Sequence, residues 1–249
     1  MNAKYTSPSC SDNMAKNDHT NKPGLWSAMT SPVGRKLLTG LTGLVWVVFV
    51  IAHMVGNLGY FASDEAYNLY SDFLLSTGPV IYLVEVFLVV TLLIHAVIGI
   101  DIYRKKKRAR QQNYERYTSA GRPSLLSISS RTMIYTGLIL LVFLVIHLRT
   151  FKFGPGIDAG YVAMVGADEI RDLKRLVTEK FQSPLYAFGY PIVMVLLGFH
   201  LRHGIWSAFQ SLGAMNKRLT PIVYLVGTLT AIGVAIGFLV LPLYIFFLA

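Results

Sequence analysis

Two histidines and an arginine interrupt one of the apolar stretches of this chain, GFHLRHGIWSAFQ at 198–210. They are His200, Arg202 and His203. Ionisable side chains are costly inside a membrane or a protein core, so their presence there points to a function. Three further apolar segments carry one histidine each, and these are His53, His95 and His147. Because imidazole binds metal ions and carries protons, these are the two chemistries to consider.

Two of these histidines are predicted to lie near the outer membrane surface. His53 follows Arg35 by about five helical turns, and His147 follows Arg131 by slightly less. A helix rises about 1.5 Å per residue, so both histidines lie about 24–27 Å from the cytoplasmic edge of their segments.

The other two are predicted to lie near the inner surface. His95 follows Pro79, and His200 follows Pro184, by the same interval of between four and five helical turns. Their helices run in the opposite direction, so both lie about 24 Å from the outer edge. The histidines therefore form two pairs at two depths, one from each of four helices. His203 is placed about 4.5 Å deeper than His200 and about 60° around the helix, as a group near the edge of the inner site.

Two imidazoles that face each other at one depth can hold a haem iron from both sides, an arrangement suited to electron transfer. A zinc site would need three or four ligands in one place. The glycines Gly43, Gly99, Gly137 and Gly204 fall near the depth of the inner pair and would leave room for the flat ring. Small-residue helix packing explains any one of these glycines equally well, and a single histidine is often just hydrogen-bonded to a neighbouring helix.

The elements that carry these residues are membrane spans. Hydrophobic residues make up 53% of the 249 residues and charged residues only 14%, against about a quarter in soluble domains. Five segments are long enough to cross a bilayer: 36–60, 79–103, 131–151, 184–211 and 221–247. Thr220 is expected to cap the last of them. The predicted fold is an all-α, integral membrane bundle of five helices that binds two haems.

Charge gives the expected orientation. Basic residues precede the first span, follow the second in RKKKRAR at 104–110, and precede the fifth, so the N-terminus is predicted to be cytoplasmic and the C-terminus outside. The same clustering explains the net charge of +10 without nucleic acid. Residues 1–30 are polar and are predicted to be a flexible cytoplasmic tail, and 31–249 one helical domain. Cys10 is the only cysteine, which excludes an intrachain disulfide and a cysteine-based metal site.

Four segments carry a family resemblance, and they are SPVGRKLLTGLTGL at 31–44, AHMVGNL at 52–58, HAVIGIDIYRKKKRA at 95–109 and FHLRHGIWSAFQSLG at 199–213. From about residue 28 onward the chain resembles the five-helix, dihaem cytochrome b anchors of succinate dehydrogenases and fumarate reductases. The H-x-x-x-G of the last segment is the most specific feature, and it assigns the ligand role to His200.

The resemblance implies two b haems, the outer iron on His53 and His147 and the inner iron on His95 and His200. It implies a membrane quinone, menaquinone or ubiquinone, and two cytoplasmic partners, a flavoprotein that oxidises succinate and an iron–sulfur subunit. The chain would be the electron-transfer and quinone-binding subunit of such an enzyme in the cytoplasmic (inner) membrane. The direction of the reaction and the side of the quinone site stay open.

Other polar residues are candidates for the quinone or for haem propionates. Glu85, Glu65 and Asp64 are acidic groups on the predicted outer side, where a carboxyl is able to exchange protons with a quinone. On the inner side, Ser31, Arg35 and Arg202 are candidates for contact with a quinone or a propionate, and equally for a helix cap and topology charges.

Two other functions fit the same residues. One is a dihaem cytochrome b of a different membrane oxidoreductase, such as a hydrogenase or a formate dehydrogenase. The other is a proton-coupled transporter that uses histidine and glutamate relays without redox chemistry. No Ser-His-Asp arrangement, phosphate-binding loop or dinucleotide fingerprint fits a site in the sequence.

Overall fold

Five long helices dominate the computed structural model, which describes residues 24–109 and 128–249. They are α2 (Pro32–Leu58), α4 (Pro79–Arg108), α5 (Ile128–His147), α7 (Pro184–Ser211) and α8 (Leu219–Leu248). All five are long and apolar enough to span a membrane, α2 together with η1 (Gly59–Phe61), and α5 together with the π-helix η2 (Leu148–Lys152). The prediction of a helical, five-span protein is confirmed.

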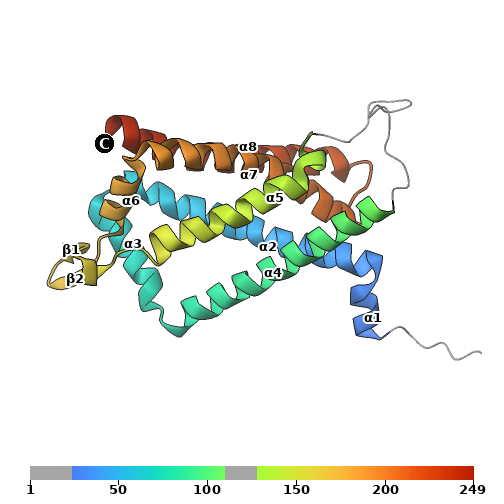
Figure 1. The fold of residues 1–249 in the computed structure, drawn as a ribbon, viewed down its shortest axis with the longest axis horizontal. Helices are drawn as coiled ribbons and strands as arrows, with labels where there is room; N and C mark the ends of the chain where they lie inside the picture. The colour runs from blue at the N-terminus through green and yellow to red at the C-terminus, as the bar shows by residue number, and fades with distance from the viewer. Residues whose placement is uncertain (1–23, 110–127) are drawn as a thin grey trace, which may run out of the picture.

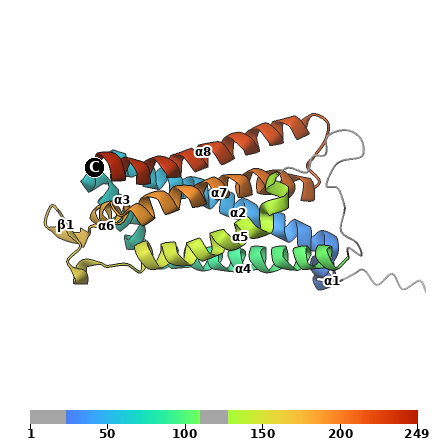
Figure 2. The same cartoon turned by 45° about the horizontal axis from the view of Figure 1, so that its top comes forward.

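The long helices lie side by side along the longest axis of the molecule (Figures 1 and 2). α7 packs against α8 along much of its length and also contacts α2 and α5, while α4 packs mainly on α2. Many apolar side chains of these helices stay exposed, for example Val48, Leu83 and Leu229. Such surfaces are suited to lipid, because the hydrocarbon of a bilayer replaces the protein core as their apolar surroundings.

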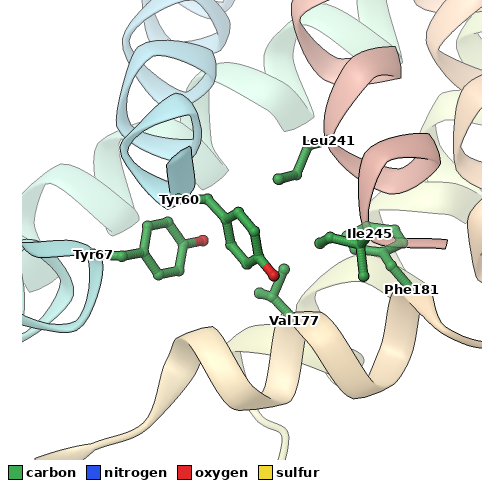
Figure 3. Close-up of a cluster of buried hydrophobic side chains, with 6 residues drawn as sticks. All are labelled: Tyr60, Tyr67, Val177, Phe181, Leu241 and Ile245. Atoms are coloured by element: carbon green, nitrogen blue, oxygen red, sulfur yellow. The ribbon is translucent and has the colours of Figure 1, made fainter. Parts of the chain in front are cut away.

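Short elements close one end of the bundle, which we call the cap end (Figure 1). They are α3 (Asp64–Ser76), η3 (Ile157–Ala159), the antiparallel hairpin of β1 (Val162–Val165) and β2 (Asp168–Arg171), and α6 (Leu173–Phe181). α3 and α6 are held together by Asn68, which is buried and whose side chain bonds Asp172 Oδ1 and Lys174 N at 2.9 Å each. A hydrophobic cluster joins α3 and α6 to η1 and α8. Its members are Tyr60, Tyr67, Val177, Phe181, Leu241 and Ile245 (Figure 3).

The opposite end, which we call the basic end, carries α1 (Leu25–Thr30), the Arg104–Arg108 run at the end of α4, and Lys217 and Arg218 between α7 and α8 (Figure 1). The basic residues that flank the spans, and that are predicted to be cytoplasmic, therefore lie together at this end of the bundle. Within the predicted tail, residues 25–30 form the helix α1. Residues 1–23 of that tail, with Cys10, and residues 110–127 between α4 and α5 lie outside the described residues.

The helix starts follow known capping rules, with one correction. Ser31 caps α2 by accepting a hydrogen bond from Gly34 N at 3.0 Å. The expectation that Thr220 caps the last helix is wrong, because α8 begins at Leu219 and the Thr220 hydroxyl donates instead to Asn216 O. The N-cap residue of α8 is Arg218, and Asn216 Oδ1 accepts from Arg218 N and Leu219 N at 2.9 Å each. Thr220 lies inside the first turn, where its own N–H already donates to Asn216 O at 2.9 Å.

Candidate functional site

Four histidines from four helices come together in two pairs. His53 of α2 and His147 of α5 form the pair nearer the cap end, with ring centroids 5.7 Å apart and ring planes at 88°. His95 of α4 and His200 of α7 form the pair nearer the basic end, with centroids 6.4 Å apart and planes at 64°. These are the two pairs expected from depth. Their role as iron ligands stays a prediction.

The cap-end pair is held by aromatic rings and by one amide. His53 stacks on Phe49, with centroids 5.5 Å apart, and His147 stacks on Phe143 at 5.7 Å. Asn57 lies one turn after His53, with its Nδ2 3.4 Å from His53 Nε2 and donating to His53 O at 2.8 Å. Tyr67 donates to Asn57 Oδ1 at 3.1 Å. Burial raises the pKa of the Tyr67 phenol, so this hydroxyl stays protonated and remains a donor.

The basic-end pair is held by hydrogen bonds to its Nδ1 atoms. His95 Nδ1 lies 3.0 Å from the carbonyl oxygen of Thr39, and His200 Nδ1 lies 3.1 Å from Thr136 Oγ1. A partner at Nδ1 orients an imidazole and leaves Nε2 available as a ligand.

Both pairs line one large cavity of about 2790 Å³ between α2, α4, α5 and α7. Ordinary small-molecule pockets have volumes of roughly 300–1,000 Å³, so this cavity has room for more than one group. The four glycines noted in the sequence also line it: Gly43, Gly99, Gly137 and Gly204. Apart from the adjoining backbone of its own helix, no described atom lies within 4 Å of the position that a Cβ would take at Gly99 or Gly204, which leaves open space one turn from His95 and His200.

The donor set fits haem better than a bare metal ion. Within residues 24–109 and 128–249, no three His, Cys, Asp or Glu side chains gather closely enough to hold an ion. Haem needs only two axial ligands from the protein, because its macrocycle supplies the other four nitrogens. Bonds from imidazole to a first-row metal ion are about 2.0–2.1 Å, which puts the centres of two opposed rings about 6 Å apart. Both observed separations are near this value.

The predicted acidic residues are divided between two cavities. Glu85 lines the large cavity and forms an ion pair with Lys152, the last residue of η2. Asp64 and Glu65 are exposed and line a separate cavity of about 840 Å³ at the cap end, where Asp64 pairs with Lys174. Only Glu85 therefore shares a space with the histidines.

The candidates at the basic end take different positions. His203 lines the large cavity three residues beyond His200, with its ring 5.7 Å from Trp206. Ser31 serves as the α2 cap. Arg35 forms an ion pair with Asp101 of α4 and also donates to Thr30 O at 2.9 Å. Neither Ser31 nor Arg35, nor Arg202, is among the described residues that line the large cavity.

The residues that support the histidines were missed in the sequence. Thr39, Thr136 and Asn57 are polar residues in apolar helices, and each lies one turn from, or opposite, a histidine. Only Thr136 has a usable signal among them, because the Thr136-Gly137 dipeptide precedes His147 by the same interval as Thr42-Gly43 precedes His53. The sequence gives no such signal for Lys152. Its approach to Glu85 depends on the π-helix that directly follows His147, which has an extra residue in its turn.

Comparison of the chain with protein-family models, with curated proteins and with solved structures gives no match. The role of the chain is therefore inferred from the five helices that are long and apolar enough to span a membrane and from the geometry of the paired histidines.

Proposed function

We propose that this chain is the dihaem cytochrome b anchor of a succinate:quinone oxidoreductase or fumarate reductase. The observation that supports this most directly is that four helices each supply one imidazole, and that these imidazoles face each other in two pairs within one cavity. Helix packing alone does not require paired histidines, because a single histidine can be satisfied by a hydrogen bond to a neighbouring helix.

The histidines would hold two haems, His53 and His147 the one nearer the cap end, and His95 and His200 the one nearer the basic end. Haem bound on both sides supplies a one-electron relay that does not bind oxygen. Gly43 lies against His95 and is ten residues from His53, so the two levels are separated by about 15 Å along α2. The chain thus places relays at two depths of the membrane.

In this proposal the basic end faces the cytoplasm and receives the iron–sulfur subunit, which is itself bound to the flavoprotein. Basic residues flank the spans at this end, in keeping with the positive-inside rule. The quinone binds from the membrane, where its isoprenoid tail is soluble.

Glu85 is the acidic residue best placed to exchange protons with that quinone. It lines the large cavity from the first half of α4, and Lys152 holds it in place from the opposite wall. Intramembrane carboxyls paired in this way are costly and mark functional sites.

Replacing Glu85 by glutamine is expected to lower the quinone-dependent turnover of the complex by roughly 100-fold, the usual cost of losing a positioned proton donor or acceptor. The measurement is the steady-state rate with a water-soluble quinone. Glu65→Gln is the matched control, because Glu65 is exposed and lines the other cavity. A wild-type rate for Glu85→Gln would remove this residue from the mechanism.

Loss of the ion pair needs its own control, because Glu85→Gln leaves Lys152 without its partner, and an unpaired charge destabilises a protein. The double variant Glu85→Gln/Lys152→Gln removes both charges. We expect it to recover the thermal stability of the wild-type chain and to keep the low turnover. Recovery of turnover as well would show that only the unpaired lysine was harmful.

The whole proposal is tested by isolating the tagged chain from its native membranes under mild conditions. We expect two partners to copurify, one with covalent or tightly bound flavin and one with iron–sulfur clusters, and succinate to reduce the haems. A hydrogenase or formate dehydrogenase module in place of these partners would favour the alternative oxidoreductase. A chain free of haem and of partners would contradict both and would favour a transporter.

A further inference from the structure

A short sequence pattern occurs twice in the bundle. Thr42-Gly43 precedes His53 in α2, and Thr136-Gly137 precedes His147 in α5, with nine residues between each glycine and its histidine. Ten residues of helix rise about 15 Å, so each Thr-Gly pair lies well away from the cap-end pair to which its own histidine belongs. Each Thr-Gly pair lies instead beside a histidine of the other pair, on a different helix.

The glycines make room for the rings of the basic-end pair. A Cβ at Gly43 would lie 3.0 Å from His95 Cε1 and 3.3 Å from its Nδ1. A Cβ at Gly137 would lie 3.3 Å from His200 Cε1. All three distances are tighter than ordinary van der Waals contacts, so the imidazoles rest directly on the helix backbone, where a larger residue would push them away.

The threonine on α5 fixes the protonation of His200. The Thr136 hydroxyl has one proton, and that proton is directed to the carbonyl oxygens of Thr132 and Met133, each 3.1 Å away. With that proton directed to a carbonyl, an oxygen lone pair faces His200 Nδ1 at 3.1 Å, and we infer that this nitrogen carries the ring proton. Thr136 is one of the few fully buried polar residues, at 4% exposure, so water does not compete for the bond.

On α2 the same outcome is reached with a different acceptor. His95 Nδ1 lies 3.0 Å from Thr39 O, and a carbonyl oxygen only accepts, so Nδ1 is again the donor. Thr42 Oγ1 is farther away, at 3.5 Å. Gly43 allows this contact, because a side chain there would stand between the ring and the backbone.

We propose that Gly43 of α2 and the Thr136-Gly137 pair of α5 are positioning elements for the basic-end histidines. The glycine seats the ring, and a neighbouring oxygen on the same helix holds Nδ1–H, so that Nε2 of His95 and of His200 faces the cavity as a ligand. Thr136 provides this oxygen through its side chain, whereas α2 provides it through the Thr39 backbone. The identity of the ligand as haem iron rests on the proposed function. The orientation and the tautomer of the His95 and His200 rings do not depend on the proposed function.

The two helices therefore differ in what a Thr→Val substitution removes. Thr136→Val takes away the acceptor of His200. Thr42→Val leaves the Thr39 carbonyl in place and is expected to change little. Thr91→Val on α4 is a control, because Thr91 is also buried and bonds its own helix at Leu88 O, with no histidine involved. Thr136→Ser keeps the hydroxyl and should restore wild-type behaviour.

In the haem-loaded protein we expect Thr136→Val to weaken retention of one haem by about 10–100-fold, the usual effect of losing the partner of a metal-bound imidazole. Its midpoint potential is expected to rise, since an imidazole without this bond is a weaker donor to ferric iron. The other haem, and both haems of the Thr42→Val and Thr91→Val proteins, should keep their affinity and potential. Equal shifts in Thr42→Val and Thr136→Val would overturn the assignment.

A second readout needs no haem. Nitrogen NMR of the full-length chain, labelled at histidine, reports which ring nitrogen carries the proton, and His200→Gln identifies the signal. We expect the Nδ1–H form for His200, lost in Thr136→Val and kept in Thr136→Ser and Thr91→Val. The Nε2–H form in the wild-type chain would overturn the proposal. A chain that never binds haem but shows the expected tautomer would contradict the proposed function and still support the positioning role.

Discussion

His200→Ala is expected to remove one of two haems, so that the haem content falls from about two to about one per chain, while His203→Ala keeps both. His200 faces His95 with ring centroids 6.4 Å apart, and its Nδ1 is held by Thr136. Alanine supplies no axial ligand, and loss of one of two axial imidazoles leaves the iron held from a single side. The measurement is the reduced-minus-oxidised spectrum together with a pyridine haemochrome assay.

His203 is the matched control because it lies on the same helix and lines the same cavity. Its ring contacts Trp206 on its own helix, and it has no ring contact with another histidine of the described residues. We expect His203→Ala to shift the potential of the basic-end haem and to leave its amount unchanged. If His203→Ala loses that haem and His200→Ala retains it, the two roles must be exchanged.

The second large effect concerns which histidines act together. His53→Ala and His147→Ala are expected to remove the same spectral component, and His95→Ala the other one. The reason is geometric, since His53 and His147 are 5.7 Å apart between ring centroids, whereas α2 carries His53 about 15 Å from the level of His95. Redox titration resolves the two components when their potentials differ.

Two controls keep this comparison interpretable. Each single variant is expected to retain one intact haem, and that haem shows that the bundle is still folded. His53→Ala/His147→Ala should look like either single variant, because the two residues serve one site. Removal of the same component by His53→Ala and by His95→Ala would show that the pairing across α2/α5 and α4/α7 is wrong.

Much of the fold was predictable from the sequence, because long apolar segments bounded by prolines and charges leave few alternatives. Pro79 and Pro184 begin their helices as expected, so residue counts from them gave the correct relative depths of His95 and His200. Depth along a helix follows from the constant rise per residue. This is why the two pairs could be anticipated without knowing which helices are neighbours.

The faces of the helices were not predictable in the same way. A helix that is apolar around its whole circumference gives no signal for which side meets another helix. The contacts of Thr136 with His200 and of Glu85 with Lys152 join residues 64 and 67 positions apart, and they depend on helix rotation and on the π-turn after His147. The cap end was also missed, since short polar helices and a two-stranded hairpin leave only weak local patterns.

We infer that each chain holds two haems between paired imidazoles. The most direct test is the molar ratio of haem b to polypeptide, measured by pyridine haemochrome assay and quantitative amino-acid analysis on the full chain purified from membranes with a sufficient haem supply. We expect about two haems per wild-type chain, and about one for each of His53→Ala, His95→Ala, His147→Ala and His200→Ala. A wild-type ratio of one or zero would contradict it.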